Sequence, residues 1–142
     1  MTSKIVVDTS IIIKWLNKTN EQHIEKTDKL MESALAGTTV LIAPELSKYE
    51  IGNVLLTGKK LNPREANVSL GTSYSLPVTF ITESEDLAKE TFKIAYKSNI
   101  TYYDASFLSL AKKYKATLVT ENIKHQGRAK GIKTTALKDY KI

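Results

Sequence analysis

The chain has 142 residues, enough for one domain to bury a core without cross-links, and it has no cysteine, which excludes disulfides and thiolate zinc sites. Its composition, with 42% hydrophobic and 25% charged residues, is that of a folded globular protein. No apolar run approaches the roughly 20 residues that span a membrane, and no signal peptide is visible, so we expect a cytoplasmic protein without a membrane partner.

Apolar runs and amphipathic stretches alternate along the chain. We expect buried strands at 4–7, 38–43 and 116–120, a brief extended stretch at 78–81, and a fourth strand at 132–135. The expected helices cover 11–16, 20–36, 45–57, a stretch from 63 onward, a stretch ending near 97, and 102–114. Asn62-Pro63 predicts one helix start, and the segment from Thr82 to Glu85 predicts a capping box at another.

This alternation of strands and helices determines the expected architecture. Strands separated by helices form a mostly parallel sheet with helices on both faces, here of four to five strands. No linker, repeat or low-complexity segment interrupts the pattern, so we expect an α/β fold in a single domain, 1–142.

Two acidic residues interrupt apolar helix faces. Glu50 and Asn53 fall within an apolar arc of the helix at 45–57, made by Leu46, Tyr49, Ile51, Val54 and Leu56. Asp104 falls within the arc of the helix at 102–114, which contains Tyr103 and Phe107, whereas Ser109 is expected on the solvent face. A carboxylate inside a packing face costs several kcal/mol unless it is paired or binds a metal ion.

Asp8 and the segment 120–122 add oxygen-bearing groups where strands end. Ligand sites in parallel α/β sheets lie beyond the carboxyl ends of the strands. Each acid has a simpler interpretation: Asp8 as a helix cap, Asp104 as a first-turn residue that favours the helix dipole, and Glu50 as a partner of a lysine. Since all three would have to hold together, we favour a divalent metal site, and its oxygen ligands favour Mg²⁺ or Mn²⁺ over zinc.

These residues resemble the PIN-domain nucleases, and within them the VapC-like toxins of prokaryotic toxin–antitoxin pairs. The resemblance rests on four fragments in order, which are Ile5-Val6-Val7-Asp8-Thr9-Ser10, Pro44-Glu45-Leu46 with Tyr49-Glu50-Ile51-Gly52-Asn53, Thr101-Tyr102-Tyr103-Asp104-Ala105, and Ala116-Thr117-Leu118-Val119-Thr120. It implies a three-layer α/β/α fold and an acidic pocket at Asp8, Glu50 and Asp104. It also implies an RNA substrate, a small antitoxin partner and a homodimer.

The fourth acid of the family departs from the expected pattern. Its position, two residues after Thr120, holds Asn122, and Glu121 lies one residue early. Either Glu121 substitutes as ligand and catalytic group, or Asn122 ligates through its amide, or a second metal position is weakened. The resemblance also implies supporting roles for Thr9 or Ser10 toward a water or phosphate, although both can cap the helix, and for Asn53 in orienting Glu50. Thr120, at the end of its strand, is a further expected supporting residue.

Positive charge is concentrated late in the chain, within a net charge of +6 and a pI near 9.4. Lys124, His125, Arg128 and Lys130 are interpreted as RNA phosphate contacts, although a solvated lysine-rich surface is an equally simple reading. We expect a metal-dependent endoribonuclease. The alternatives are a catalytically impaired RNA-binding or assembly module, a housekeeping RNA-processing ribonuclease, and, more weakly, a phosphotransfer domain with Asp8 as nucleophile.

Overall fold

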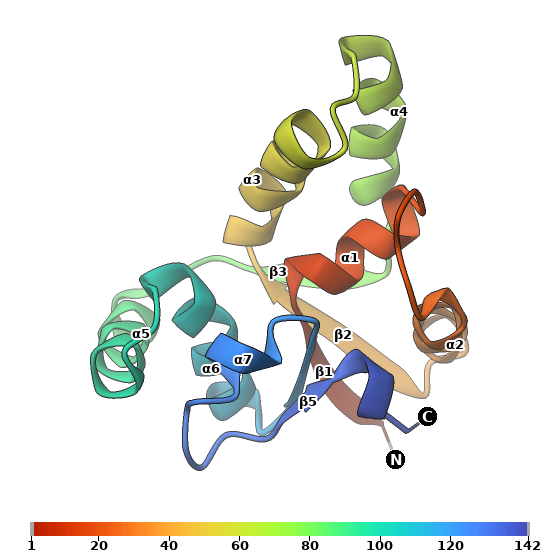
Figure 1. Ribbon diagram of the computed structural model, residues 1–142. Helices are drawn as coiled ribbons and strands as arrows, with labels where there is room; N and C mark the ends of the chain where they lie inside the picture. Colours follow the sequence, from red (N-terminus) through yellow and green to blue (C-terminus); the bar gives the residue numbers. More distant parts are fainter. Residues whose placement is uncertain (1, 142) are drawn as a thin grey trace.

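The computed structural model describes residues 2–141, in which strands and helices alternate (Figure 1). The strands are β1 Ser3–Val7, β2 Thr39–Pro44, β3 Val78–Ile81, β4 Thr117–Thr120 and β5 Thr134–Ala136. The helices are α1 Thr9–Leu16, α2 Ile24–Leu35, α3 Leu46–Asn53, α4 Pro63–Ser73, α5 Glu85–Ser98, α6 Tyr102–Tyr114 and α7 Ile123–Gln126. In this range no helix is both long and apolar enough to cross a membrane.

The five strands form one parallel sheet in the order β3-β2-β1-β4-β5. The expected mostly parallel sheet is therefore confirmed, and the stretch at 78–81 is its edge strand. β1 is the central strand, with hydrogen-bonded neighbours on both sides, and Val7 lies in register with Val119 of β4. The organisation of 1–142 as a single domain stays a prediction.

Alternate side chains of the central strands enter two separate cores. Ile5 and Val7 pack with α1, α2 and α3, whereas Val6 packs on the opposite face with α5 and α6. All three are at most 3% exposed, as expected for a strand covered on both faces. The result is the three-layer α/β/α arrangement that the sequence predicts, with α3 and α4 projecting beyond the sheet (Figure 1).

Local sequence explains most helix starts. The structure corrects two of the expected ones. Asn62 makes the predicted capping box with Glu65, ahead of Pro63 at the first position of α4. The helix expected from residue 20 begins instead at Ile24, because His23 has a left-handed backbone with φ of 59°. The cap of α5 is Ser84, which accepts a hydrogen bond from the backbone amide of Leu87, so the capping box expected from Thr82 is wrong.

The expected apolar arcs on two helices are also partly wrong. Tyr49 and Leu56 are 77% and 67% exposed, because α3 packs through Ile51 and the helix then continues as a π-helical turn, Val54–Gly58. On α6, Tyr103 is exposed, whereas Ser109 is buried and shares a hydrogen bond with Thr91 of α5. A small hydroxyl residue can therefore occupy a core position where a partner satisfies it.

Candidate active site

Asp8 lies where the central strand β1 ends and α1 begins. Its backbone amide donates to the Val119 carbonyl, which extends the pairing of β1 with β4, and its Oδ2 accepts from the amide of Ser10 as the cap of α1. Its Oδ1 accepts from Nε2 of Gln126 over 3.1 Å. The side chain is buried, and this burial raises the pKa of Asp8, with a smaller contribution from the charge of Asp104. The cap of α1 is therefore also a buried carboxylate that joins α1 to Gln126.

Glu50 lies on α3 and faces the start of α1. Its Oε1 accepts a hydrogen bond of 2.7 Å from the Thr9 hydroxyl, which joins two segments 41 residues apart. Partial burial raises the pKa of Glu50, and the charges of Asp8 and Asp104 raise it further, while the Thr9 hydrogen bond acts in the opposite direction. Glu50 is thus held near two other acids and has a neutral donor as its partner.

Asp104 is in the first turn of α6, after the cap Thr101 whose hydroxyl accepts from the Asp104 amide. Gln126 connects this residue to Asp8, because its Nε2 also donates to the Asp104 carbonyl oxygen over 3.3 Å. Asp104 lines a surface hollow of about 660 Å³ together with Asn122, His125 and Arg128. The three acids predicted from sequence, here called the acidic pocket, come from β1–α1, α3 and α6, and Glu50 lines a different surface hollow from Asp104.

Both candidates for the fourth position have other partners. Glu121 Oε2 lies 3.0 Å from the ammonium of Lys14, and the Glu121 amide donates to Ser10 Oγ. Asn122 Oδ1 lies 2.9 Å from His125 Nδ1. Thr120, also predicted as a supporting residue, is fully buried, and its hydroxyl accepts from the Asn122 amide. Glu121 and Asn122, here called the fourth corner, are thus held in place by contacts within the chain.

Lys14 is the centre of a charged network beside the pocket. It is only 2% exposed, and its ammonium pairs with Glu21 as well as Glu121 and donates to the Gln22 carbonyl. Burial raises the pKa of Glu21, but hydrogen bonds from Lys59 and Lys14 outweigh it and lower the pKa below its usual value. The buried ammonium is therefore fully paired, as a charge inside a protein must be.

The remaining predicted residues are less closely connected to the acids. Asn53 is exposed, and within residues 2–141 no hydrogen bond joins its side chain to Glu50; Thr9 makes that contact instead. Lys124, His125, Arg128 and Lys130 are exposed on α7 and the segment after it. Arg128 donates to the carbonyl of Asn99, the left-handed residue that ends α5.

Gln126 and Lys14 are the two residues that sequence reasoning missed. Lys14 carries the same signal that identified the acids, since it is a charge inside the otherwise apolar helix Thr9–Leu16. Gln126 had no such signal, because a glutamine in a short polar segment gives no indication that it is fully buried. Its Oε1 is buried without a hydrogen-bond partner, which marks an incomplete polar environment beside Asp8.

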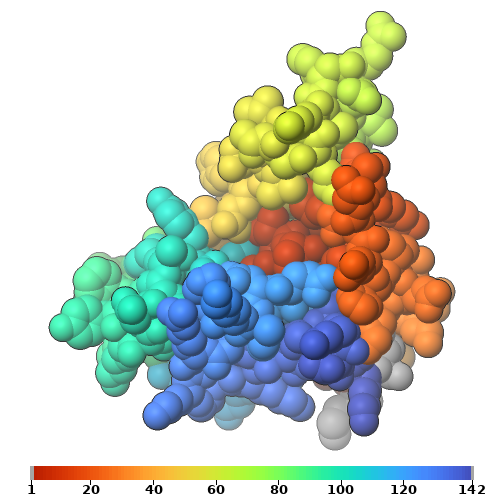
Figure 2. All heavy atoms as spheres, in the orientation of Figure 1, coloured from red at the N-terminus to blue at the C-terminus, as the bar shows by residue number. Residues whose placement is uncertain are grey.

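The donors around the acidic pocket fit a divalent ion in type. Asp8 and Glu50 accept only from neutral groups, which leaves two carboxylates without a cationic partner among the residues described. The three carboxylates and the unpartnered amide oxygen of Gln126 are hard donors of the kind that Mg²⁺ and Mn²⁺ prefer. Between residues 2 and 141, however, no group of three or more acidic, histidine or cysteine side chains is close enough together to hold an ion as it stands. Figure 2 shows the red start of the chain recessed between α3 and the blue segment that contains α7.

The PIN domain family model matches residues 5–131, from the first core residue of β1 to the segment after α7. The chain belongs to the PIN domain family. The family assignment made from the four sequence fragments is therefore confirmed. No curated protein matches the chain in sequence.

Solved structures of PIN proteins share this fold. VapBC2 from Rickettsia felis, bound to a DNA fragment from its promoter, has a TM-score of 0.71 at 20% identity, covering 94% of this chain and 98% of that one. VapBC from Salmonella typhimurium, also bound to DNA, has a TM-score of 0.67 at 19% identity over 96% and 99%. VapC20 from Mycobacterium tuberculosis, a sarcin-ricin loop cleaving toxin, has 0.66 at 17% over 90% and 95%. At these identities the likeness establishes the fold.

Proposed function

We propose that this PIN domain is an Mg²⁺- or Mn²⁺-dependent endoribonuclease that hydrolyses RNA phosphodiester bonds. The observation that carries the proposal is the convergence of Asp8, Glu50 and Asp104 from three distant segments at the carboxyl end of the central strand. The charge of Asp104 raises the pKa of Asp8, the charges of Asp8 and Asp104 raise the pKa of Glu50, and no cation among residues 2–141 pairs with Asp8 or Glu50. A divalent ion would favour the ionised form of these carboxyl groups and so offset the free-energy cost of burying them close together.

Asp8, Glu50 and Asp104 would hold the ion. When bound, a divalent ion stabilises negative charge on a phosphate and lowers the pKa of water, so that hydroxide is available at neutral pH. The chain's own residues prepare the ligands for that role. Ser10 and Gln126 each donate to one oxygen of Asp8, and Thr9 donates to Glu50, so the carboxylates are oriented before an ion arrives.

Cleavage of a labelled RNA with Mg²⁺ or Mn²⁺ tests the proposal. We expect activity from the wild-type protein, inhibition by EDTA, and no activity from Asp8→Asn or Asp104→Asn. Asp28→Asn on α2 is the matched control, since it removes one carboxylate outside the acidic pocket. Undiminished cleavage by Asp8→Asn from a preparation free of other nucleases would contradict the proposal.

The same proposal extends to the toxin of a VapBC-type pair, with a small antitoxin as partner. Its support is the likeness in fold to VapBC from two bacteria, each described as a complex on DNA. A cytoplasmic location and a homodimer are part of this proposal. A short open reading frame next to the gene, whose product co-purifies with this chain and suppresses cleavage, is the expected result; its absence favours a housekeeping RNA-processing ribonuclease.

A second candidate function is a catalytically impaired RNA-binding or assembly module. The observation that favours it is the fourth corner, where Glu121 is paired with Lys14 and Asn122 with His125. This candidate requires RNA binding without cleavage in either metal. The activity measurement described above separates the two functions directly.

A further inference from the structure

A second hollow lies on the other side of Arg128 from Asp104. It has a volume of about 560 Å³ and is bounded by α5, α6 and the segment after α7. Its cationic lining is Lys93, Lys97, Lys112, Arg128 and Lys130, and its one acidic residue is Glu90. We call it the basic hollow. Five cations against one carboxylate leave an excess of four positive charges in one concave surface.

Internal ion pairs neutralise only part of this charge. Glu90 pairs with Lys112 and lies 3.9 Å from Lys93, so one carboxylate serves two lysines. Within residues 2–141 no ion pair engages Lys97 or Lys130, and both side chains are exposed. One amino group of Arg128 donates to the Asn99 carbonyl, which fixes the guanidinium while its other donors stay available. Concentrated, unpaired cations in a hollow raise the local concentration of anions.

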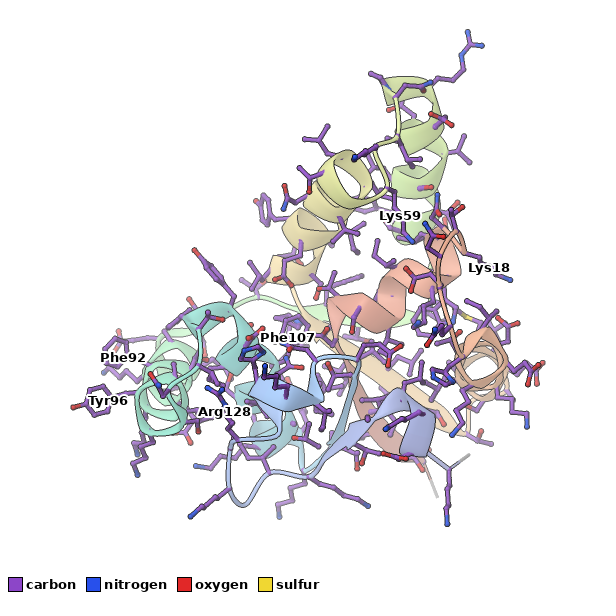
Figure 3. All side chains as sticks on the ribbon, in the orientation of Figure 1. Lys18, Lys59, Phe92, Tyr96, Phe107 and Arg128 are labelled. Carbon is purple, nitrogen blue, oxygen red and sulfur yellow. The ribbon has the colours of Figure 1, made fainter. Side chains whose placement is uncertain are left out.

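Arg128 joins the basic hollow to the hollow that contains Asp104. It lines the basic hollow with Lys97 and Lys130, and it also lines the hollow that contains Asp104. Figure 3 shows its side chain between α5 and the segment of α7. A chain of phosphates that passes Asp104 therefore meets Arg128 and then the basic hollow.

We infer that the basic hollow binds backbone phosphates of the RNA strand whose scissile bond lies at the acidic pocket. This inference rests on the proposed ribonuclease function for the location of cleavage, but the binding itself can be measured separately. It adds Lys93, Lys97 and Lys112, from α5 and α6, to the phosphate contacts expected from sequence at Arg128 and Lys130. The strand leaves the acids in the direction of α5.

The chemistry of the hollow indicates contact with phosphates rather than bases. Its polar lining is cationic apart from Glu90 and Ser98, and its other lining residues include small or aliphatic side chains such as Ala129 and Ile132. The exposed aromatic residues of α5, Phe92 and Tyr96, are not among the lining residues and lie on the side of α5 away from Arg128 in Figure 3, so no ring lines the hollow for base stacking. Binding at this surface should therefore depend strongly on salt and little on sequence.

The test compares Lys97→Gln/Lys130→Gln with the matched control Lys18→Gln/Lys29→Gln. Both pairs remove two exposed lysines, and Lys18 lies on the opposite side of the view in Figure 3. Fluorescence anisotropy with a labelled single-stranded RNA of mixed sequence, in EDTA and over a series of KCl concentrations, measures Kd without cleavage. Losing two phosphate contacts should make the negative slope of log association constant against log salt shallower by about 1.4. It should also weaken binding roughly tenfold near physiological salt.

The outcomes separate this inference from the proposed function. If the wild type cleaves RNA but the Lys97→Gln/Lys130→Gln variant keeps the wild-type affinity and salt slope, the inference is wrong and the proposed function stands. If the variant shows the expected loss while the wild type cleaves nothing with Mg²⁺ or Mn²⁺, the binding surface stands and the proposed function fails. An equal loss in both double variants, or no RNA binding by the wild type, also overturns the inference.

Discussion

Gln126 donates from Nε2 to Oδ1 of Asp8 over 3.1 Å, and the Gln126 side chain is fully buried where it does so. This contact joins α7 to the end of the central strand. Burial raises the pKa of Asp8, and the hydrogen bond from Gln126 acts against that rise. Gln126 is therefore a positioning residue, which keeps an acid of the pocket oriented and closer to its ionised form.

Gln126→Ala should weaken Mn²⁺ binding by about tenfold, the usual effect of losing a partner of a metal ligand. Because the pKa of Asp8 rises further in this variant, the loss should be largest at mildly acidic pH and should diminish as pH increases. Calorimetric titration with Mn²⁺ over a pH series measures it, with the exposed Gln22→Ala as control. A loss of affinity that is the same at every pH would indicate a packing defect instead.

Asp8→Asn should stabilise the metal-free protein at neutral pH. The pKa of Asp8 is raised in the folded state, so folding is unaffected by this group below its unfolded value of 3.8 and is progressively destabilised as pH rises through the folded value. Asparagine caps helices as well as aspartate and carries no charge, and its amide nitrogen can donate to Gln126 Oε1, which has no partner in the wild type, once the Gln126 amide rotates. We expect a melting temperature higher by roughly 2–5 °C at neutral pH and no difference below pH 3.8.

Thermal melts in EDTA across pH measure this effect, and Asp28→Asn is the control. Adding Mn²⁺ should raise the melting temperature of the wild type but not of Asp8→Asn, because only an ion that binds the folded state stabilises it. A variant that is less stable than the wild type at every pH would show that the Asp8 charge contributes to the fold.

Thr9→Val should lower cleavage by about tenfold at neutral pH, whereas Thr9→Ser should stay close to the wild type. The Thr9 hydroxyl donates to Glu50 and lowers its pKa, so removing the donor raises the pKa of Glu50 further and favours its protonated form. The dependence of kcat on pH is the measurement. Equal activity in the valine and serine variants would mean that the hydroxyl has no role.

Lys14→Met should lower the free energy of unfolding by roughly 1–3 kcal/mol, because it removes the buried donor of the Gln22 carbonyl and one of the two cations of Glu21, which still pairs with Lys59. Glu21 has a pKa below its usual value, so the stabilisation is present above about pH 4.5 and is lost as pH falls. The penalty measured by urea unfolding should therefore shrink in acid. Lys29→Met, on the exposed face of α2, is the control.

Glu121→Gln tests whether the fourth corner binds metal. Because Lys14 pairs with the Glu121 carboxylate, we expect the variant to retain wild-type Mn²⁺ affinity, whereas Asp104→Asn loses it. Titration of both variants under the same conditions decides the question. A large loss in Glu121→Gln would mean that this carboxylate exchanges Lys14 for the ion.

The sheet and the three acids could be predicted because each leaves a strong local signal. Ile5-Val6-Val7 is apolar at successive positions, which is typical of a strand covered on both faces, and Asp8 follows directly. Glu50 and Asp104 were found as charges on helices rich in apolar residues. The structure places Glu50 beside Thr9 and near Asp8 although the arc itself was partly wrong, since Tyr49 is exposed.

The remaining features depend on contacts between distant segments. Gln126 is buried only because α7 folds over the end of β1, which no pattern near residue 126 reveals. The sequence predicts that Ser109 faces solvent, but the residue is buried because Thr91 of the neighbouring helix shares a hydrogen bond with its hydroxyl. The basic hollow likewise forms from α5, α6 and the segment after α7. The excess of positive charge could therefore be predicted from sequence, whereas the hollow that concentrates it could not.

The central position of β1 also determines how long the acidic pocket lasts. β1 is hydrogen-bonded to β2 and β4, and the Asp8 amide continues that ladder to Val119. Amide hydrogens of a central strand exchange only through openings of high free energy, whereas helix ends fray far more often. Asp8 therefore keeps its place through local fluctuations of the surrounding helices, whereas Asp104, in the first turn of α6, and Glu50, on α3, move with theirs. The acidic pocket is therefore lost first on its helical side.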